Sequence, residues 1–600
     1  MLDRAPRRPL AETPEGRDGA TLGFGSDLAA EALRRLGVPY IALNPGASFR
    51  GLHDSLVNYL GNDTPQILLV LHEMHAPAIA HGYAKATDRP MAAALHSNVG
   101  LMNGAMGVFN AWCDRAPMVL IGANGAMDAA RRRPWIEWIH STQDQGALIR
   151  DFTKWDDSPG SPEAAVESIF RAGQIATTQP YGPTYVCLDV TWQEAELSAA
   201  PELPDPARFG PGPRPEPAAA AATEAGERLF AAERPLLLFG RGSRDAADWE
   251  ARVALAERLG ARVLTDLKQG AVFPTAHPLH PVGPGLIPSP DALALIRDSD
   301  VICAFDWVDL GGALASAFGR ADPPAAVINC TLDAHNHRGW SADHHILPAA
   351  DLRLMADPDA AVHAILRALG PREPRPLPPA PAPARLDRPS AGAELTLSSI
   401  AGAVLDAGAD AAGPITLVRV PLGWPIAAAR FEGPLDYTGF DGGGGVGSGP
   451  GIAVGAALGV MEHGRLPVAV MGDGDFLMGA TALWTAVKYR IPLLVLVANN
   501  RSYFNDEMHQ HTIAARRGRP VANRWIGQRI EDPAPDCAGF GRAQGAEGIG
   551  PVTDPEALDA AVRRGLDIVA QGGVCVIDVR IASAYESEVS TKVVSSGATG

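Results

Sequence analysis

Short apolar runs alternate with segments of helical periodicity along most of the chain. In the first third the apolar runs lie at 40–43, 67–71, 91–95 and 118–121. Between them, residues 76–86 and 101–112 have apolar positions spaced every three to four residues, which predicts helices. Strands that are apolar throughout and alternate with helices are typical of a parallel sheet covered on both faces.

The same alternation occurs twice more. The apolar runs lie at 235–239, 262–264, 301–304 and 326–328 in the middle of the chain, and at 415–418, 467–471, 493–497 and 574–577 in its last third. Two stretches rich in Pro and Ala separate the three blocks and indicate extended linkers. The pattern therefore predicts an α/β protein with three doubly wound, mainly parallel-sheet domains.

These boundaries divide the 600 residues into domains of ordinary size. The expected divisions are a disordered leader at 1–22, a first domain at 23–198, a linker at 199–222, a middle domain at 223–369, a Pro-rich linker at 370–392, a third domain at 393–583 and a tail at 584–600. The leader is charged and lacks the apolar core of a signal peptide.

Charge and cysteine content narrow the class of protein. The chain has 51 Lys and Arg against 68 Asp and Glu, a formal net charge of −17, which argues against nucleic acid as a partner. The six cysteines are widely spaced and form no C-x-x-C pair, which favours a reducing cytoplasm. We find no apolar run of about 18 residues, so we expect no membrane span.

The segment 467–506 carries the most informative chemistry. Its order is strand, Gly-Asp-Gly-Asp, helix, strand and Asn-Asn, so Asp473 and Asn500 follow two strands of one parallel sheet. Ligands bind at this edge of such sheets, and carboxylate and amide oxygens suit Mg²⁺. Gly472 and Gly474 would let phosphates approach the backbone, with the positive end of a helix after Asp475.

Either motif alone is commonly an ordinary turn, but the pair is specific. Asn500 lies 27 positions after Asp473. The segment resembles the signature of thiamin diphosphate (ThDP) enzymes, GDG followed by about 26 residues and NN. The resemblance implies that Asp473, Asn500 and the backbone carbonyl of Ser502 hold Mg²⁺. It also places Gly472, Gly474 and Asp475 beside the cofactor diphosphate.

Glu73 follows an apolar run and precedes a helical segment, LHEMHAPAIAHGYAKATDRP. Taken alone, it is most simply a glutamate at a helix N-terminus. The segment resembles the E-x₈-GYA-x₄-[KR]P pattern of the pyruvate-oxidase-like superfamily, which includes benzoylformate decarboxylases and acetolactate synthases. That resemblance implies that Glu73 binds N1′ of the cofactor aminopyrimidine and activates the cofactor.

Residues 441–459 form a glycine run that leads into a helix of small residues. A flexible linker is the alternative, but a linker would not continue into an apolar helix. The resemblance implies that the carbonyl of Gly444 binds the 4′-amino group of the cofactor. It also implies that Val446 is the apolar wedge beneath the cofactor, smaller than the Met, Leu or Ile usual there.

His96 opens the segment HSNVGLMNGAMGVFNAW, which resembles the substrate-facing segment of benzoylformate decarboxylase. It would orient a substrate carboxylate or shuttle protons, and the alternative is a capping or core histidine. The loop NPGASF resembles the NPGS loop of that enzyme, with Ala47 in place of the serine and Ser48 as the alternative hydroxyl. The middle domain has no counterpart of that enzyme's second catalytic histidine.

The resemblance implies three domains that bind the pyrimidine, form the middle domain and bind the diphosphate. It further implies a homodimer or homotetramer, with ThDP between the Glu73 domain of one chain and the Asp473 domain of a neighbour. The GRGS segment at 240–243 leaves FAD or ADP in the middle domain as a further option. Residues 131–145, RRRPWIEWIHSTQDQ, line the entrance or form an ordinary surface loop.

The function expected first is a ThDP- and Mg²⁺-dependent 2-oxo acid decarboxylase (a lyase), acting through ylid attack on the carbonyl and an enamine intermediate. The second is an acetolactate-synthase-like carboligase (a transferase), or a C–C lyase for 2-hydroxyketones or 2-hydroxyacyl thioesters. The third is a ThDP-fold subunit that binds without catalysis. Intact Glu73, Asp473 and Asn500 argue against the third.

Overall fold

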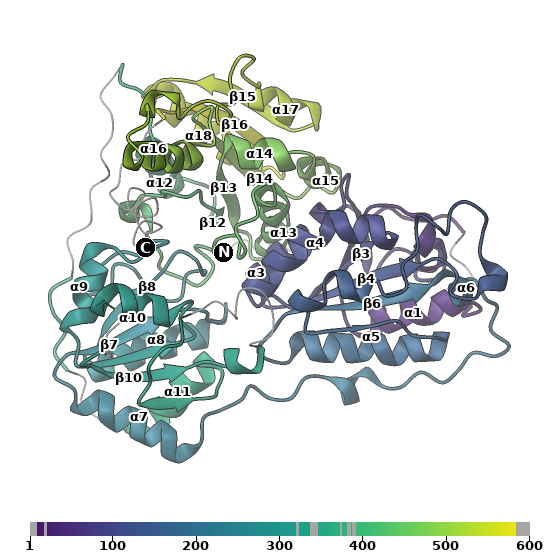
Figure 1. Cartoon of the computed structure of the whole chain (residues 1–600), viewed down its shortest axis with the longest axis horizontal. Helices are drawn as coiled ribbons and strands as arrows, with labels where there is room; N and C mark the ends of the chain where they lie inside the picture. Colours follow the sequence, from purple (N-terminus) through teal and green to yellow (C-terminus); the bar gives the residue numbers. More distant parts are fainter. Residues whose placement is uncertain are drawn as a thin grey trace.

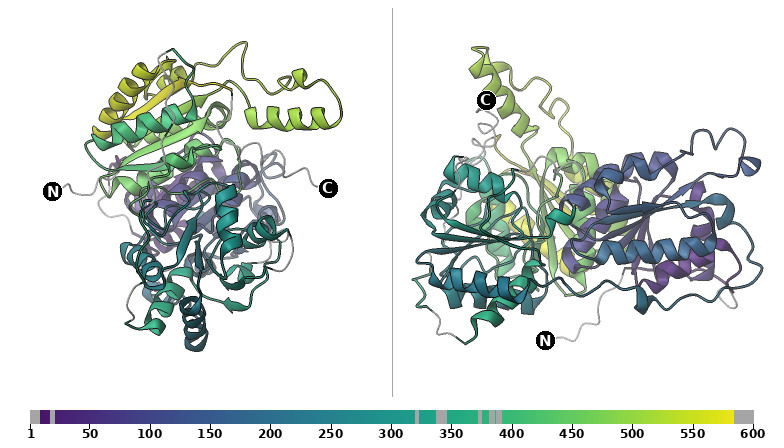
Figure 2. Two further views of the ribbon diagram at one scale, coloured as in Figure 1. Left: turned by 90° about the vertical axis from the view of Figure 1, so that its left-hand side faces the viewer. Right: turned by 60° about the horizontal axis from the view of Figure 1, so that its bottom comes forward.

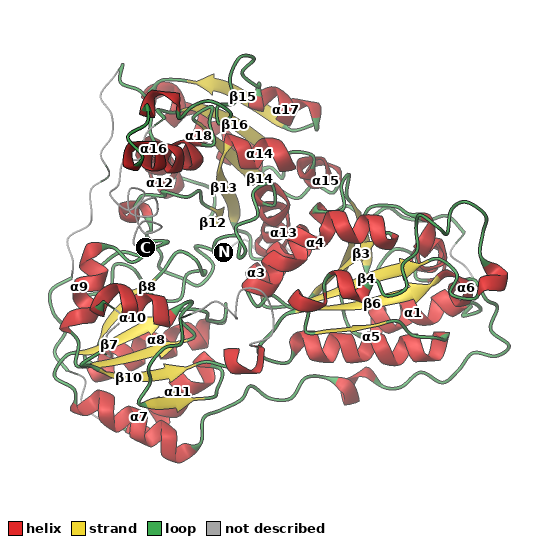
Figure 3. Ribbon diagram, viewed as in Figure 1, coloured by secondary structure: helices red, strands yellow, loops and turns green. Residues whose placement is uncertain are grey.

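The computed structural model describes residues 9–16, 21–319, 323–336, 346–371, 375–380, 386 and 392–583. Three parallel sheets, each flanked by helices, form three domains (Figures 1 and 3). The predicted fold class is therefore confirmed. The predicted apolar runs coincide with strands because these strands are buried on both faces.

The N-terminal domain has a six-stranded sheet in the order β2-β1-β3-β4-β6-β5. Its strands are β1 (Tyr40–Leu43), β2 (Gln66–Leu69), β3 (Met91–Leu95), β4 (Met118–Asn124), β5 (Trp155–Asp157) and β6 (Pro183–Asp189). Its helices are α1 (Gly25–Arg35), α2 (Arg50–Asp54), α3 (His75–Thr87), α4 (Ser97–Cys113), α5 (Pro162–Thr177) and α6 (Val190–Gln193). The pattern predicted neither β6 nor β5, a half-buried edge strand that carries two aspartates.

The middle domain has a five-stranded sheet in the order β11-β10-β9-β7-β8. Its strands are β7 (Pro235–Phe239), β8 (Arg262–Thr265), β9 (Val301–Phe305), β10 (Ala326–Cys330) and β11 (Leu352–Leu354). Its helices are α7 (Ala219–Ala231), α8 (Ala246–Leu259), α9 (Pro290–Asp298), α10 (Leu310–Phe318) and α11 (Pro358–Leu369). Helix α7 begins inside the segment expected as a linker, because its run of alanines is a good helix former.

The C-terminal domain has the strand order β12-β13-β14-β16-β15. Its strands are β12 (Ile415–Arg419), β13 (Leu466–Gly472), β14 (Leu493–Asn499), β15 (Glu547–Val552) and β16 (Val574–Arg580). Its helices are α12 (Leu397–Ala409), α13 (Gly449–Met461), α14 (Asp473–Gly479), α15 (Ala482–Lys488), α16 (Phe504–Arg516), α17 (Cys537–Ala543) and α18 (Pro555–Ala570). Helix α16 and the loop that follows it project from the rest of this domain (Figure 2).

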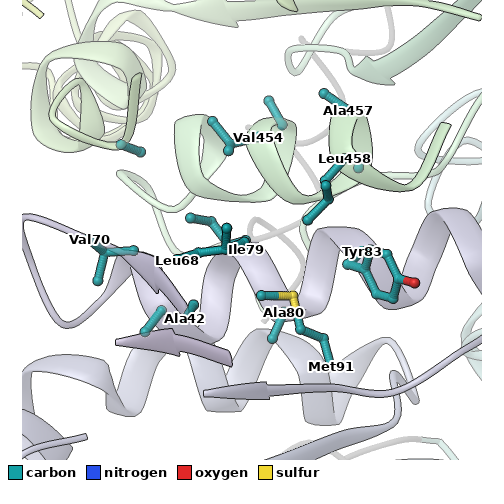
Figure 4. Packing of buried hydrophobic residues seen from close by; sticks show 14 of the residues in the cluster. Ala42, Leu68, Val70, Ile79, Ala80, Tyr83, Met91, Val454, Ala457 and Leu458 are labelled. Carbon is teal, nitrogen blue, oxygen red and sulfur yellow. The ribbon is translucent and has the colours of Figure 1, made fainter. Parts of the chain in front are cut away.

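Helices α3 and α13 join the N- and C-terminal domains through backbone contact. A Cβ atom at Gly82 would overlap the carbonyl oxygen of Ile452, and one at Gly455 would overlap that of Ile79. Ile79 and Val454 are fully buried in the core that this contact creates (Figure 4). The two domains therefore share one hydrophobic core, and the small residues of α13 make the close approach possible.

Part of the segment expected to be a disordered leader has defined contacts. The backbone N–H of Leu10 donates to the carbonyl of Tyr489 at 3.1 Å, and Glu12 lies 2.8 Å from Lys488. Residues 9–12 therefore attach to the C-terminal domain. Among the described helices, none is both long and apolar enough to cross a membrane. The expected tail, and much of the second linker, lie outside the described residues.

Candidate active site

Asp473 and Asn500 lie at the carboxyl ends of the neighbouring parallel strands β13 and β14, as predicted. Burial raises the pKa of Asp473 to about 6, and the backbone N–H groups of Asp473, Gly474 and Arg501 lower it only in part. Asp473 Oδ2 is buried and has no hydrogen-bond partner among the described residues. A buried oxygen without a partner is what a cation would satisfy, so this acid fits a Mg²⁺ ligand.

The helix after the strand begins at Asp473, and not after Asp475 as we expected. Asp475 therefore lies in the first turn, where its carboxylate accepts hydrogen bonds from the backbone N–H groups of Gly447 (2.7 Å) and Gly449 (3.2 Å). Arg419 lies 3.1 Å from Asp475 and 2.9 Å from Asp441, and all three are buried. This network ties the glycine-rich segment to the Gly-Asp-Gly turn.

The loop after β14 is fixed by side chains on both sides. Asn499 is buried and donates to Asp578 at 2.8 Å. Asn500 Oδ1 accepts from the N–H of Ser502 at 3.0 Å and keeps a second lone pair for another partner. The Ser502 hydroxyl donates to the fully buried Glu507 at 2.5 Å. The Ser502 hydroxyl is thus engaged, and its backbone carbonyl is the group left to act as the expected ligand.

The glycine-rich segment passes between the two domains that hold the candidate residues. Gly444 has a φ of +72° and open space where a Cβ would stand. A Cβ at Gly447 would lie 2.9 Å from Met478 of α14 and 3.5 Å from Met74, the neighbour of Glu73. The side chain of Val446 is 48% exposed, so it is available to contact a ligand. Glu73 and the Gly-Asp-Gly turn thus flank one segment.

Glu73 lies in the turn between β2 and α3 and is half-buried. Its Oε2 accepts a hydrogen bond from Asn103 Nδ2 at 3.1 Å. A Cβ at Gly100 would lie 3.3 Å from Glu73 Cγ and 3.5 Å from His96 Cβ, so a glycine in α4 lets both side chains approach the same turn. The structure therefore brings Glu73 and His96 together.

His96 follows β3 and precedes α4, and its ring is half-buried. The Ser48 hydroxyl lies 2.8 Å from His96 Nδ1, within hydrogen-bond distance. Of the two residues considered in the NPGASF loop, Ser48 is thus the one that contacts His96. Burial lowers the pKa of His96, and the nearby His140 lowers it further.

His140 is a site residue that we did not predict. Its ring centroid lies 4.8 Å from that of His96, with an angle of 71° between the ring planes. The sequence predicts only that residues 131–145 line an entrance or form a surface loop, because a loop has no periodicity that fixes which side chain turns inward. The clustering of Trp, His and Gln in that loop was the one available signal.

The GRGS segment follows β7 and faces a cavity of about 150 Å³ between the N-terminal and middle domains. The buried Arg241 donates to the carbonyl of Cys113 at 3.0 Å and lies 3.5 Å from Asp306. Arg244 donates to the carbonyls of Ala271 and Pro434. These guanidinium groups already have partners within the protein, and FAD or ADP in the middle domain stays a prediction.

Each of the three domains matches the model of a known protein family. The model of the N-terminal TPP binding domain of thiamine pyrophosphate enzymes matches residues 24–148. The model of the central domain matches residues 222–363, and that of the C-terminal TPP binding domain matches residues 423–579.

Several individual proteins are similar over nearly the whole chain. A benzoylformate decarboxylase of Pseudomonas aeruginosa is 28% identical, covering 90% of this chain and 94% of its own length. A probable 2-ketoarginine decarboxylase of the same organism is 29% identical, covering 93% and 94%. The crystal structure of benzoylformate decarboxylase from Polynucleobacter necessarius superposes with a TM-score of 0.75 at 21% identity, covering 94% of this chain and 99% of that one.

Proposed function

Because this chain belongs to the thiamine pyrophosphate enzymes, with all three of their domains, we propose that it is a Mg²⁺-dependent 2-oxo acid decarboxylase. The observation that carries this proposal is His96, held by Ser48 at 2.8 Å and placed beside Glu73. An imidazole next to the activating carboxylate provides a group that can bind a substrate carboxylate or transfer a proton.

The residues that would hold the cofactor come from two domains. Asp473, Asn500 and the carbonyl of Ser502 would bind Mg²⁺ and, through it, the diphosphate. Gly472 and Gly474 would contact the diphosphate through their backbone. When bound, thiamin diphosphate supplies a nucleophilic carbon and an electron sink that allow a bond beside a carbonyl to break.

The opposite side of the site would act on the pyrimidine ring and the substrate. Glu73 would bind the ring nitrogen N1′, and the Gly444 carbonyl would accept from the 4′-amino group. Val446 would support the cofactor from below. Decarboxylation converts a 2-oxo acid anion and one proton into an aldehyde and CO₂. His96 would deliver that proton.

The similar proteins support this substrate class. The first two relatives are named for the decarboxylation of benzoylformate and of 2-ketoarginine, which are both 2-oxo acids. A putative acetolactate synthase of Mycobacterium tuberculosis is 27% identical over 88% of this chain. The test below must therefore distinguish decarboxylation from carboligation and from cleavage of a 2-hydroxyketone.

We also infer that the active unit is a homodimer or homotetramer. Exposed apolar side chains surround the Glu73 turn and the glycine-rich segment, where a second copy would cover them. They are Leu71 (44% exposed), Met102 (54%), Val446 (48%) and Met478 (55%). The six cysteines are free thiols, and five of them are buried, which supports a location in the cytoplasm.

The test uses purified protein that has been stripped with a chelator and then resupplied with thiamin diphosphate and Mg²⁺. CO₂ release is followed with pyruvate, benzoylformate, branched 2-oxo acids and 2-ketoarginine. We expect release that requires both additions. A parallel analysis of products, with and without an acceptor aldehyde, distinguishes an aldehyde product from a ligated one.

Glu73→Gln is expected to lower turnover at least about 100-fold, within the range that general acid–base groups contribute, while the protein still binds the cofactor. The matched control is Glu202→Gln, which changes an exposed glutamate remote from the site. Cofactor binding without CO₂ release from any 2-oxo acid would exclude decarboxylation. Unchanged turnover in Glu73→Gln would exclude the role of Glu73.

A further inference from the structure

His96 and His140 form a pair of histidines that come from separate parts of the N-terminal domain. Their ring centroids are 4.8 Å apart in an edge-on arrangement, and Phe49 packs against the other side of His96 with its centroid 6.2 Å away. Ser48 engages Nδ1 of His96. Nε2 of His96 therefore remains the ring nitrogen that can act on a ligand.

The loop that carries His140 is held in place on both sides of this residue. The Ser97 hydroxyl donates to the His140 carbonyl oxygen. Ser97 has a φ of +54°, a left-handed conformation that is costly for a residue with a side chain. On the other side, Asn124 exchanges hydrogen bonds with the backbone of Thr142, at 2.8 Å and 3.3 Å.

A buried glutamate anchors the same loop from within. Glu137 is 5% exposed and accepts from the backbone N–H of Ala126 at 3.1 Å and from Arg133 at 2.6 Å. These contacts fix the backbone on the side opposite to Thr142. The position of His140 beside His96 is therefore built by several independent contacts.

Burial and three charged or titratable side chains act on the pKa of His96. Burial disfavours the imidazolium and lowers its pKa most, followed by the like charge of His140; Glu73 raises the pKa, and Arg133 lowers it. Ser48 and Phe49, which also face the ring, are uncharged. Among these groups, His140 is the one whose ring packs directly against the ring of His96.

We propose that His140 is a positioning residue that acts through His96: its ring, packed edge-on against that of His96, sets the pH at which His96 becomes charged. Two imidazolium ions at this separation repel each other, so the second proton binds only at lower pH. The catalytic role of this pair rests on the proposed function, because decarboxylation consumes one proton for each CO₂ released.

The test measures the protonation of His96 without any substrate. The enzyme, loaded with thiamin diphosphate and Mg²⁺, is treated with diethyl pyrocarbonate, which modifies neutral imidazole, at pH values from about 5 to 8, around the ordinary histidine pKa. Mass spectrometry of the peptides gives the midpoint for His96. The variants are His140→Gln and His140→Lys, with His53→Gln as the control on an exposed histidine of α2.

Removing the titrating partner should raise the His96 midpoint by about 0.5–1 pH unit in His140→Gln, and a permanent charge should lower it in His140→Lys. His53→Gln should match the unaltered protein. Unchanged midpoints in both His140 variants, with circular dichroism that shows an intact fold, would overturn the proposal. If His140→Gln does not fold, His140→Asn replaces it in the same comparison.

Enzyme kinetics provide a second measurement. The acid limb of the pH profile of kcat/KM should move in the same direction as the His96 midpoint in each variant. If no 2-oxo acid is decarboxylated, the proposed function fails, and the modification experiment still decides whether His140 controls the protonation of His96.

Discussion

Two aspartates of the Gly-Asp-Gly-Asp turn have opposite electrostatic surroundings. Asp475 has Arg419 at 3.1 Å and two backbone donors, and so holds the glycine-rich segment. Asp473 is buried without a cationic side chain as partner among the described residues, and one of its oxygens has no partner at all. Because Asp473 is buried and lacks a counter-charge, it is the aspartate of this turn that a bound cation would stabilise.

Asp473→Asn should stabilise the cofactor-free protein. It should also abolish the further stabilisation that thiamin diphosphate and Mg²⁺ give to the unaltered protein. The folded pKa of about 6 lies above the ordinary value of 3.8, so this group's contribution to stability is present below about pH 4 and is lost as the pH rises through 6. At pH 7.5 the variant should gain about 1–3 kcal/mol, and this gain should disappear near pH 4.

Thermal unfolding at several pH values, with and without thiamin diphosphate and Mg²⁺, measures both effects. Asp506→Asn, at an exposed position of α16, is the matched control and should change neither. A metal-free Asp473→Asn protein that is less stable than the original at pH 7.5 would contradict the account of a buried carboxylate without a partner.

Among the helices, α3 and α13 determine where the two halves of the site lie. Glu73 immediately precedes the turn into α3, and the glycine-rich segment leads directly into α13. The backbone contacts at Gly82 and Gly455 leave no room for a side chain between these helices. Within one chain, the distance between the Glu73 turn and the glycine-rich segment is therefore set by a glycine contact midway along both helices.

Gly455→Val should destabilise the protein by about 2–4 kcal/mol, because the new side chain must displace the backbone of α3. Weaker binding of thiamin diphosphate should accompany this loss. Urea unfolding and fluorescence titration with the cofactor measure the two effects. Gly160→Ala places a methyl group in open space and is the control. Equal stability of both variants would show that α3 and α13 can separate at no cost.

For the whole molecule, hydrogen bonds of two arginines join the middle domain to the other two domains. Arg241 contacts Asp306 and Asp333 of its own domain and the Cys113 carbonyl at the end of α4. The backbone N–H of Arg244, in the same domain, donates to the Asp88 carboxylate at the end of α3. The Arg244 guanidinium donates to the carbonyl of Pro434 in the C-terminal domain. The middle domain thus braces the ends of α3 and α4, which begin at the active site.

Arg241→Met should lower the free energy of unfolding by about 1–3 kcal/mol, since it removes the guanidinium that pairs with Asp306 and donates to the Cys113 carbonyl. We also expect faster proteolysis of the 199–218 segment, which connects the first two domains. Arg228→Met, which breaks an exposed pair on α7, should alter neither measurement. The idea fails if both variants unfold at the same urea concentration and are cleaved at the same rate.

The sequence predicted the three α/β domains because strands buried on both faces must be apolar along their whole length. Runs such as 235–239 and 91–95 therefore coincide with β7 and β3. It missed β6, β11 and β15 as well as β5, whose aspartates tolerate the sheet edge, and it began the helix of the Gly-Asp-Gly turn three residues late. Local motifs also predicted that Asp473 and Asn500 would share one edge, because parallel strands end together.

Only the tertiary structure decided which side chains meet across the domains. Nothing local to residues 131–145 indicates that His140 faces His96, since that depends on contacts made by Ser97, Asn124 and Glu137. The pairing of Asp475 with Arg419 likewise joins residues 56 positions apart. Periodicity and motif spacing depend on the residues of one segment, so they predict its secondary structure. The position and protonation of the side chains in the site depend on neighbours that folding brings from elsewhere in the chain.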